Sequence, residues 1–272
     1  MSNKLYTIGH SNHDIDTFIA LLKQHGVTAL ADVRSTPYSR YLTHFCQKPL
    51  KAALEKAGIR YVFLGQELGA RPDDESCYVD GKALYERIAA TEAFSRGLER
   101  VVTGSQKFDI SLMCAEKDPL TCHRAILVCQ HLKPYSLAIN HIWNDGQLET
   151  HAHLEERLLQ AHGLAYVLNK PAEESETAQL SLFDSNASFA TSSPAVVMPK
   201  PLSLAEAIQE AYTRQGDRIA YIEHSHDSTL KIAGWDVPQA RQYIWQTYQK
   251  QSRREMTDSQ KLDFISYLEN LP

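Results

Sequence analysis

Short apolar runs alternate with segments of helical spacing through the first part of the chain. The runs lie at residues 5–8, 29–33, 60–64, 110–113 and 138–142. Between the first two runs, Ile15, Phe18 and Leu22 fall on one helical face. Strands that are joined through helices run parallel and are covered by helices on both faces. We therefore predict an α/β fold for residues 1–168, a mostly parallel, Rossmann-like three-layer sandwich.

The composition changes after this region. Residues 169–201 are rich in small polar residues, acids and prolines, which is typical of a disordered linker. Residues 202–272 regain regular patterns, and we expect a small C-terminal α+β domain there. Helical spacing resumes at Leu204, further helices are expected from Val237 and after a cap at Thr257, and the expected strands are 219–222 and 229–232.

Charge and cysteine usage restrict the functional classes. The chain has 272 residues, of which 43% are hydrophobic and 22% charged, and its net charge is −5. An acidic protein has no global field that attracts nucleic acid, so such contact needs a local patch or a recruiting partner. Five cysteines and the lack of a long apolar run near the N-terminus predict reduced thiols, a cytoplasmic location and no membrane contact.

The segment 108–131 concentrates reactive groups between an apolar run and a second apolar stretch. Asp118 and Pro119 suit the N-cap and the first position of a helix, which places the turn at the carboxyl end of a strand. Ligands bind at this edge of open α/β sheets. The turn between strand and helix carries Cys114, Glu116, Lys117, Asp118, Cys122, His123 and Arg124.

Polar residues also follow the first two runs, and together with this turn they form the predicted site. We expect acid/base or nucleophilic roles for His10, Asp32, Cys114 and Glu116. Arginines and hydroxyl groups favour an anionic ligand, most simply a phosphate. The predicted substrate-binding or phosphate-binding residues are Ser11, Arg34, Tyr38, Ser39, Arg40, His123 and Arg124.

The cysteines leave several interpretations open. Cys122 and Cys129 share a helical face with apolar residues, which favours a place in the core, whereas Cys114 is a nucleophile or a buried thiol. Neither Cys114 nor Cys122 is followed six positions later by arginine, which excludes a phosphatase-type loop. Cys114, Cys122 and His123 lack the paired spacing of common metal sites, so we predict no metal and no cofactor.

Four motifs resemble a known family. They are IGHS at 8–11, DVRSTPYSR at 32–40, LGQELGA at 64–70 and CAEKDPLTCHR at 114–124. In this order they are similar to the domain-of-unknown-function 488 family, and the resemblance covers residues 5–168. It implies a compact α/β domain with an enzymatic site around the cysteine-containing and arginine-containing motifs. It also implies a setting of nucleic-acid modification, repair or defence, in which some members are thought to work.

A second resemblance lies in the linker. The pentapeptide Gln179, Leu180, Ser181, Leu182 and Phe183 is similar to the bacterial sliding-clamp-binding peptide Gln-Leu-Ser/Asp-Leu-Phe at every position. A disordered segment can present such a peptide and become ordered on binding. The resemblance implies the DNA sliding clamp as a partner.

Together these features predict an enzyme that acts on DNA, or on a nucleotide within DNA, and is recruited by the clamp. Tethering by a partner raises the effective concentration of an acidic protein at DNA. Two alternatives remain: a non-enzymatic adaptor at the clamp, and a small-molecule enzyme that uses a cysteine nucleophile or a metal.

Overall fold

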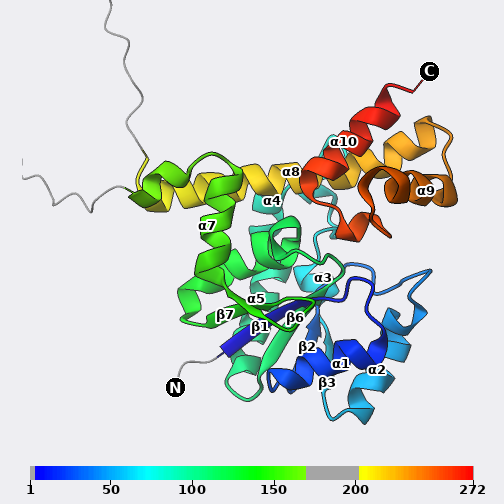
Figure 1. Ribbon diagram of the computed structural model, residues 1–272. Helices are drawn as coiled ribbons and strands as arrows, with labels where there is room; N and C mark the ends of the chain where they lie inside the picture. The colour runs from blue at the N-terminus through cyan, green and yellow to red at the C-terminus, as the bar shows by residue number, and fades with distance from the viewer. Residues whose placement is uncertain (1–3, 170–201, 272) are drawn as a thin grey trace, which may run out of the picture.

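A six-stranded sheet forms the centre of the protein, and its strand order is β3-β2-β6-β1-β7-β8. The computed structural model describes residues 4–169 and 202–271 (Figure 1). All neighbouring strands pair in parallel except β7 and β8. This arrangement confirms the predicted α/β fold. The strands are β1 (Lys4–Gly9), β2 (Ala29–Asp32), β3 (Arg60–Phe63), β6 (Ile110–Cys114), β7 (Ala138–Ile142) and β8 (Leu148–Thr150).

The register of the central strands brings the predicted site motifs to one edge. Gly9 of β1 lies opposite Cys114 of β6, and Asp32 of β2 lies opposite Met113. Pairing continues past the strand ends, because the His10 amide donates to the Cys114 carbonyl at 2.8 Å. The residues that follow β1, β2 and β6 therefore leave the sheet side by side.

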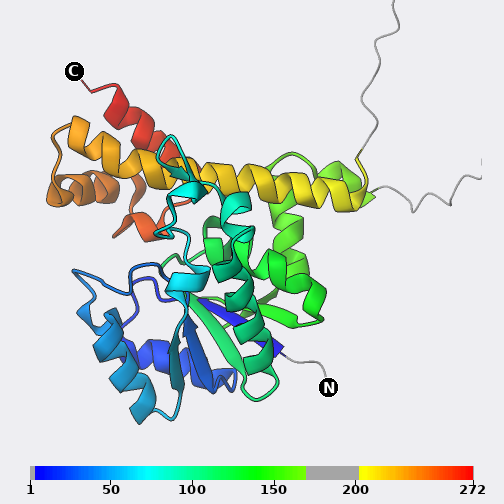
Figure 2. The same cartoon turned by 180° about the vertical axis from the view of Figure 1, so that it is seen from behind.

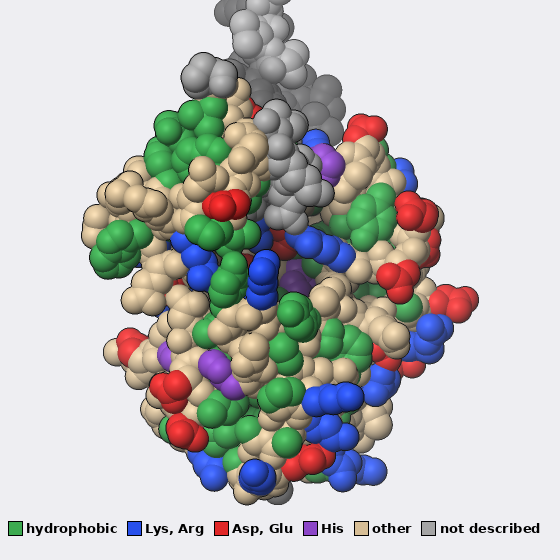
Figure 3. Space-filling view, turned by 90° about the vertical axis from the view of Figure 1, so that its right-hand side faces the viewer, with side chains coloured by type: hydrophobic (Ala, Val, Ile, Leu, Met, Phe, Trp, Pro, Cys, Tyr) green, Lys and Arg blue, Asp and Glu red, His purple; other side chains and the backbone are tan. Residues whose placement is uncertain are grey.

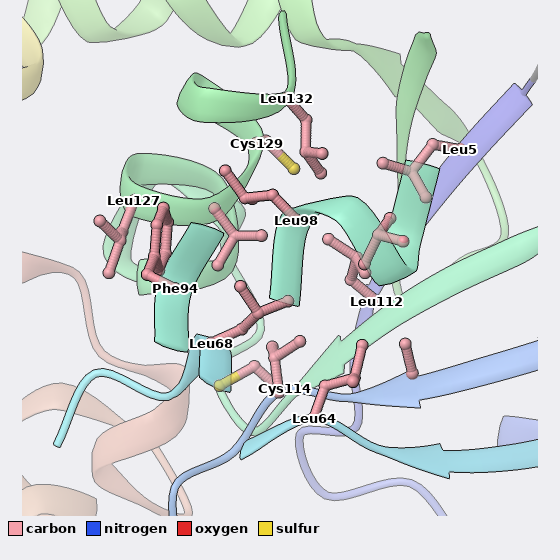
Figure 4. Close-up of a cluster of buried hydrophobic side chains, with 14 of the residues drawn as sticks. Leu5, Leu64, Leu68, Phe94, Leu98, Leu112, Cys114, Leu127, Cys129 and Leu132 are labelled. Carbon is pink, nitrogen blue, oxygen red and sulfur yellow. The ribbon is translucent and has the colours of Figure 1, made fainter. Parts of the chain in front are cut away.

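Two apolar layers cover the sheet (Figures 1 and 2). Helices α1 (Ile15–Gln24) and α2 (Gln47–Lys56) pack on one face through side chains such as Phe18 and Leu50. Helix α5 (Glu92–Ser105) packs on the other face through Phe94 and Leu98, beside the segment 124–132. In Figure 4, Cys114 lies at one margin of this second layer and Cys129 at the opposite margin.

Local sequence accounts for the helix starts. The side chain of Asp14 accepts the Thr17 amide at 2.8 Å to cap α1, and that of Thr91 accepts the Phe94 amide at 3.1 Å to cap α5. The other α-helices and strands of the α/β domain are α3 (Gly65–Leu68), β4 (Tyr78–Val79), β5 (Lys82–Ala83), α4 (Tyr85–Ala89) and α7 (His151–Ala161).

The turn after β6 departs from the prediction of one continuous helix. Asp118 caps only a single 3₁₀ turn, η3 (Pro119–Thr121), by accepting the Leu120 amide at 2.9 Å. Cys122 is then extended, with φ −137° and ψ 136°, and the chain becomes helical again at His123. The next turn, η4 (Arg124–Cys129), is π-helical and leads into α6 (Gln130–Leu132). π-helical turns are rare and occur frequently at functional sites.

All regular elements in the described part of the C-terminal tail are helices. The expected strands 219–222 and 229–232 both lie inside α8 (Leu204–Ile232), so the prediction of strands in the tail is wrong. A short apolar run such as Ile219–Ile222 fits a strand or a buried helix equally well, and here the buried positions continue the helical spacing of α8. The tail continues with α9 (Val237–Tyr248), a 3₁₀ turn η7 (Arg253–Glu255) and α10 (Asp258–Glu269).

The tail packs against the α/β domain. Ala211, Tyr212 and Ile219 of α8 share an apolar cluster with Ile126 and Leu158. Figures 1 and 2 show α8 lying along one side of the α/β domain. None of the described helices combines the length and the apolar composition that crossing a membrane requires. The predicted clamp-binding peptide lies outside the described residues.

Candidate functional site

Two thiols and an imidazole form a compact buried cluster at the end of β6. The His123 Nδ1 atom lies 3.6 Å from the Cys114 Sγ atom and 4.0 Å from the Cys122 Sγ atom. All three atoms lie within 4.8 Å of one another. The side chains are nearly inaccessible, with exposed fractions of 7% for Cys114, 1% for Cys122 and 6% for His123.

Backbone geometry builds this cluster. Cys114 is the last residue of β6, and the extended conformation of Cys122 turns its side chain toward the strand end instead of along a helical face. The ring of His123 is oriented from the other side, because its Nε2 atom lies 3.0 Å from the carbonyl oxygen of Val33. An N–H at Nε2 donates to this carbonyl, which fixes the ring so that its Nδ1 atom faces the sulfur atoms. Burial lowers the pKa of His123, but the hydrogen bond and the charge of Cys122 outweigh burial and raise it.

The two thiols differ in acidity. Burial alone raises the pKa of Cys122, but a hydrogen bond from Cys114 and the charges of Arg124 and His123 outweigh burial and hold this pKa well below its usual range. The hydrogen bond to Cys122, followed by burial, raises the pKa of Cys114. Cys122, rather than Cys114, is therefore the more readily ionised thiol of the pair.

Arg124 is fully buried beneath this cluster and organises the turn. Its Nη1 atom donates to the Glu116 carbonyl at 2.7 Å, and its Nη2 atom donates to the Lys117 carbonyl at 3.2 Å. Gly9 packs against the same turn, where a Cβ atom would lie 1.8 Å from the Glu116 carbonyl oxygen. Arg124 therefore holds the backbone of the turn in place and supplies positive charge to the thiols.

Asp32 and Arg34 form a buried ion pair. The Nε and Nη2 atoms of Arg34 donate to the two oxygens of Asp32 at 2.8 and 2.7 Å. The Tyr61 hydroxyl donates to the Oδ2 atom of Asp32 at 2.8 Å, and Asp32 is fully buried. With these donors in place, Asp32 acts as a positioning residue for Arg34.

His10 lies between this ion pair and the thiols. Its ring stacks on Phe45 with 4.2 Å between ring centroids, and the Nη1 atom of Arg34 lies 3.4 Å from its Nε2 atom. Burial, together with the charges of Arg254 and Arg34, holds the pKa of His10 well below its usual value. The ring is therefore neutral at pH 7. The next residue, Ser11, is buried and has a left-handed backbone with φ 45°.

The tail closes the site from outside the sheet. The Nδ2 atom of Asn12 donates to the Oε1 atom of Glu255 at 2.6 Å. The Nζ atom of Lys261 lies 3.6 Å from the Oε2 atom of Glu116. The charge of Arg254 acts on His10, Cys114 and Glu116. On the face in Figure 3, Lys and Arg side chains gather around a recessed histidine between the tail and the α/β domain.

Arg254 is distinguished by its lack of partners. Among residues 4–169 and 202–271 it makes no hydrogen bond or ion pair, and burial lowers the pKa of its guanidinium group. A half-buried cation without a partner is costly, and an anion at this position would offset the cost.

The remaining predicted residues lie apart from the thiols. Tyr38 is 65% exposed and Arg40 is exposed, so both face solvent on the loop that follows β2. The Oγ atom of Ser39 is occupied, because it accepts the Leu42 amide at 3.1 Å. The structure therefore brings together His10, Arg34, Cys114 and the turn at 116–124, and leaves these three loop residues outside the cluster.

Sequence reasoning missed several residues that complete the site. Cys122 is buried in the core, as helical spacing predicts, but the extended backbone at that residue also brings its thiol next to His123, which the spacing does not show. Tyr61, which bonds Asp32, has no distinguishing pattern within its strand. Arg254 and Lys261 lie in the tail, which the linker separates from the motifs. The adjacent arginines 253 and 254 are a weak sequence signal for Arg254, and Lys261 has no comparable signal.

Comparisons with known proteins agree with the motif resemblance. A protein of Synechocystis sp. (strain ATCC 27184 / PCC 6803 / Kazusa), described as Uncharacterized protein slr1353, is 46% identical over 43 residues, which are 16% of this chain and 15% of that protein. No solved structure matches the chain. Residues 14–130, which include β2, β6 and the Cys114–Cys122–His123 cluster, match the model of the family described as Domain of unknown function DUF488. Over these residues the chain is therefore similar to the DUF488 family, in agreement with the motif resemblance.

Proposed function

We propose that this protein is an enzyme that acts on DNA, or on a nucleotide within DNA, and that its chemistry takes place beside the Cys114–Cys122–His123 cluster. The observation that carries the proposal is the convergence of this cluster with His10 and Arg254 at the carboxyl ends of β1, β2 and β6. Structural packing alone does not require two thiols, two imidazoles and an unpaired guanidinium at one edge of a sheet.

Arg254 and Arg34 account for an anionic substrate. Arg34 uses its Nε and Nη2 atoms on Asp32, and its Nη1 atom faces His10. Arg254 has all of its donors available. A phosphate group between these two guanidinium groups would receive charge-assisted hydrogen bonds next to the thiols. Arg124 takes no part in this contact, because its Nη1 and Nη2 atoms donate to the backbone carbonyl groups of Glu116 and Lys117.

Recruitment by the sliding clamp is the second part of the proposal, and it rests on the pentapeptide at residues 179–183. Nothing in the net charge of −5 draws the protein to DNA, so a tether explains how the site meets its substrate. The clamp would bring the protein to newly replicated or repaired DNA.

The enzymatic part is tested with nucleotides and with single-stranded and double-stranded oligonucleotides, by chromatographic detection of products. Arg254→Gln should weaken substrate binding and reduce product formation about 10-fold to 100-fold, which corresponds to the loss of one or two charge-assisted hydrogen bonds. Arg214→Gln, a change of a surface arginine on α8, is the matched control and should retain activity. An adaptor predicts instead that Arg254→Gln and Glu116→Gln leave cellular function intact.

Recruitment is tested by a pull-down with purified clamp. Replacing both Leu182 and Phe183 by alanine should abolish binding, because these two side chains would fill an apolar pocket on the clamp. Ser181→Asp is the control, since aspartate also occurs at this position of the peptide, and it should bind as the unmodified chain does. Equal binding by the alanine variant would refute recruitment through the peptide.

A further inference from the structure

We propose that Cys114, Cys122 and His123 bind a divalent zinc ion, with one coordination position left open. The catalytic use of such an ion rests on the function proposed above, whereas its binding does not. Zinc with bonds of about 2.3 Å to sulfur and about 2.0 Å to nitrogen, in tetrahedral geometry, separates a sulfur ligand from a nitrogen ligand by about 3.6 Å.

The cluster nearly meets this requirement. The His123 Nδ1 atom lies 3.6 Å from the Sγ atom of Cys114 and 4.0 Å from that of Cys122. The three potential ligand atoms lie within 4.8 Å of one another, so the ion needs only small shifts of side chains. Two thiolates and one imidazole form a ligand set suited to zinc, which has no geometric preference of its own and accepts a tetrahedral site.

The surroundings of His123 match those of a metal ligand. Histidine ligands commonly donate the second ring N–H to a carbonyl or carboxylate group, which fixes the ring and its tautomer. Here the Nε2 atom lies 3.0 Å from the carbonyl oxygen of Val33, on the neighbouring strand. The Nδ1 atom then faces the two sulfur atoms, and it binds the ion in place of its proton.

A buried polar group without a partner lies near the cluster. The Tyr85 hydroxyl is buried and finds no hydrogen-bond partner in the described part of the chain. Both thiols lie close enough for their charges to act on it. A buried hydroxyl without a partner is unfavourable, and a water molecule or substrate oxygen on the ion would satisfy it. Three protein ligands with an open position are typical of catalytic zinc, which polarises the oxygen it binds.

The chain spacing explains why this site escapes a sequence search. Cys122 and His123 are adjacent, so they can share one ion only if the backbone between them is not helical. The extended conformation of Cys122 meets this condition, after which the helix restarts at His123. The third ligand comes from β6, on the far side of the turn that Arg124 holds.

The test uses the full chain, reduced and freed of metal, and measures binding of zinc by equilibrium dialysis and of cobalt by absorption. We expect about one zinc per chain, and for cobalt a thiolate charge-transfer band with the intense visible absorption of tetrahedral coordination. Cys122→Ser should weaken zinc binding at least 100-fold and remove part of the charge-transfer band. Cys129→Ala, at the end of the π-helical turn that follows and outside the cluster, is the control and should bind like the unmodified chain.

A variant that fails to fold does not affect the conclusion, because metal binding by the unmodified chain is the primary measurement. Failure of the reduced chain to bind zinc or cobalt, or a cobalt spectrum without thiolate bands, overturns the proposal. A cobalt spectrum that is identical in folded Cys122→Ser also overturns it. Since no substrate is present, these outcomes are independent of activity. Zinc binding without any reaction on nucleic acid would refute the proposed function and leave the metal site standing.

Discussion

Replacing Asp32 by asparagine separates two roles that a buried carboxylate can have. If Asp32 holds Arg34, as the structure indicates, the substitution destabilises the protein. The neutral side chain keeps one acceptor oxygen and presents an amide N–H₂ group to donors that previously met an oxygen, while the guanidinium of Arg34 stays 6% exposed. If Asp32 instead acted on substrate as a general acid or base, the loss would fall on activity.

The expected loss of stability is large. Removing one partner of a buried ion pair costs about 3–5 kcal/mol. With a urea dependence of about 2–3 kcal/mol per M, the unfolding midpoint should fall by roughly 1–2 M. Equilibrium unfolding in urea, followed by circular dichroism, measures this shift. A shift below roughly 0.5 M, combined with a complete loss of activity, would refute the positioning role.

Two companion variants sharpen the measurement. Tyr61→Phe removes one hydrogen bond to the carboxylate and should cost about 1.5–3 kcal/mol, less than Asp32→Asn. Adding Arg34→Gln to Asp32→Asn removes the uncompensated charge, so the double variant should be more stable than the sum of the single changes predicts. Strict additivity would show that the two side chains do not act as a pair.

Three further predictions concern stability elsewhere. Burial lowers the pKa of His151 to about 4. Between pH 6.5 and pH 4 the unfolded chain therefore binds a proton at this residue that the folded chain does not bind, and the free energy of unfolding should fall by about 3 kcal/mol. His151→Gln should flatten this part of a plot of the urea midpoint against pH. Gly9→Ala should destabilise the protein by about 1–3 kcal/mol in thermal melts, because the new Cβ atom meets the Glu116 carbonyl, whereas Gly104→Ala in α5 should be neutral or stabilising. Phe264→Ala should cost about 3–5 kcal/mol and expose the amides of α10 to hydrogen exchange, and unchanged protection there would contradict the packing of the tail.

The sheet was predictable because its central strands β1, β2 and β6 are buried on both faces. Runs such as Leu5–Ile8 and Ala29–Val33 are mostly apolar, and their alternation with helical segments is typical of parallel strands between two helical layers. The tail was not predictable by the same logic. The run at 219–222 is equally short and apolar, and its helical state depends on the contacts of α8 with Ile126 and Leu158, which local sequence does not encode.

The site was predictable in its location and less so in its chemistry. Strand ends placed His10, Asp32 and Cys114 together, as expected for a parallel sheet. Their roles depend on which hydrogen bonds are already occupied, and this depends on tertiary contacts such as that between Asp32 and Tyr61. Likewise, helical spacing correctly predicts that Cys122 is buried in the core, but it cannot show the contact of this thiol with His123, which depends on the extended residue between the two helical segments.

The contribution of the C-terminal tail to the site has an evolutionary consequence. The matched family segment ends at residue 130, so Arg254 and Lys261 line the site from outside it. Under the proposed function, mutations in the tail can change the preferred substrate without altering any residue of the shared domain. Proteins that have only the DUF488 segment in common can therefore keep one reaction while diverging in what they act on.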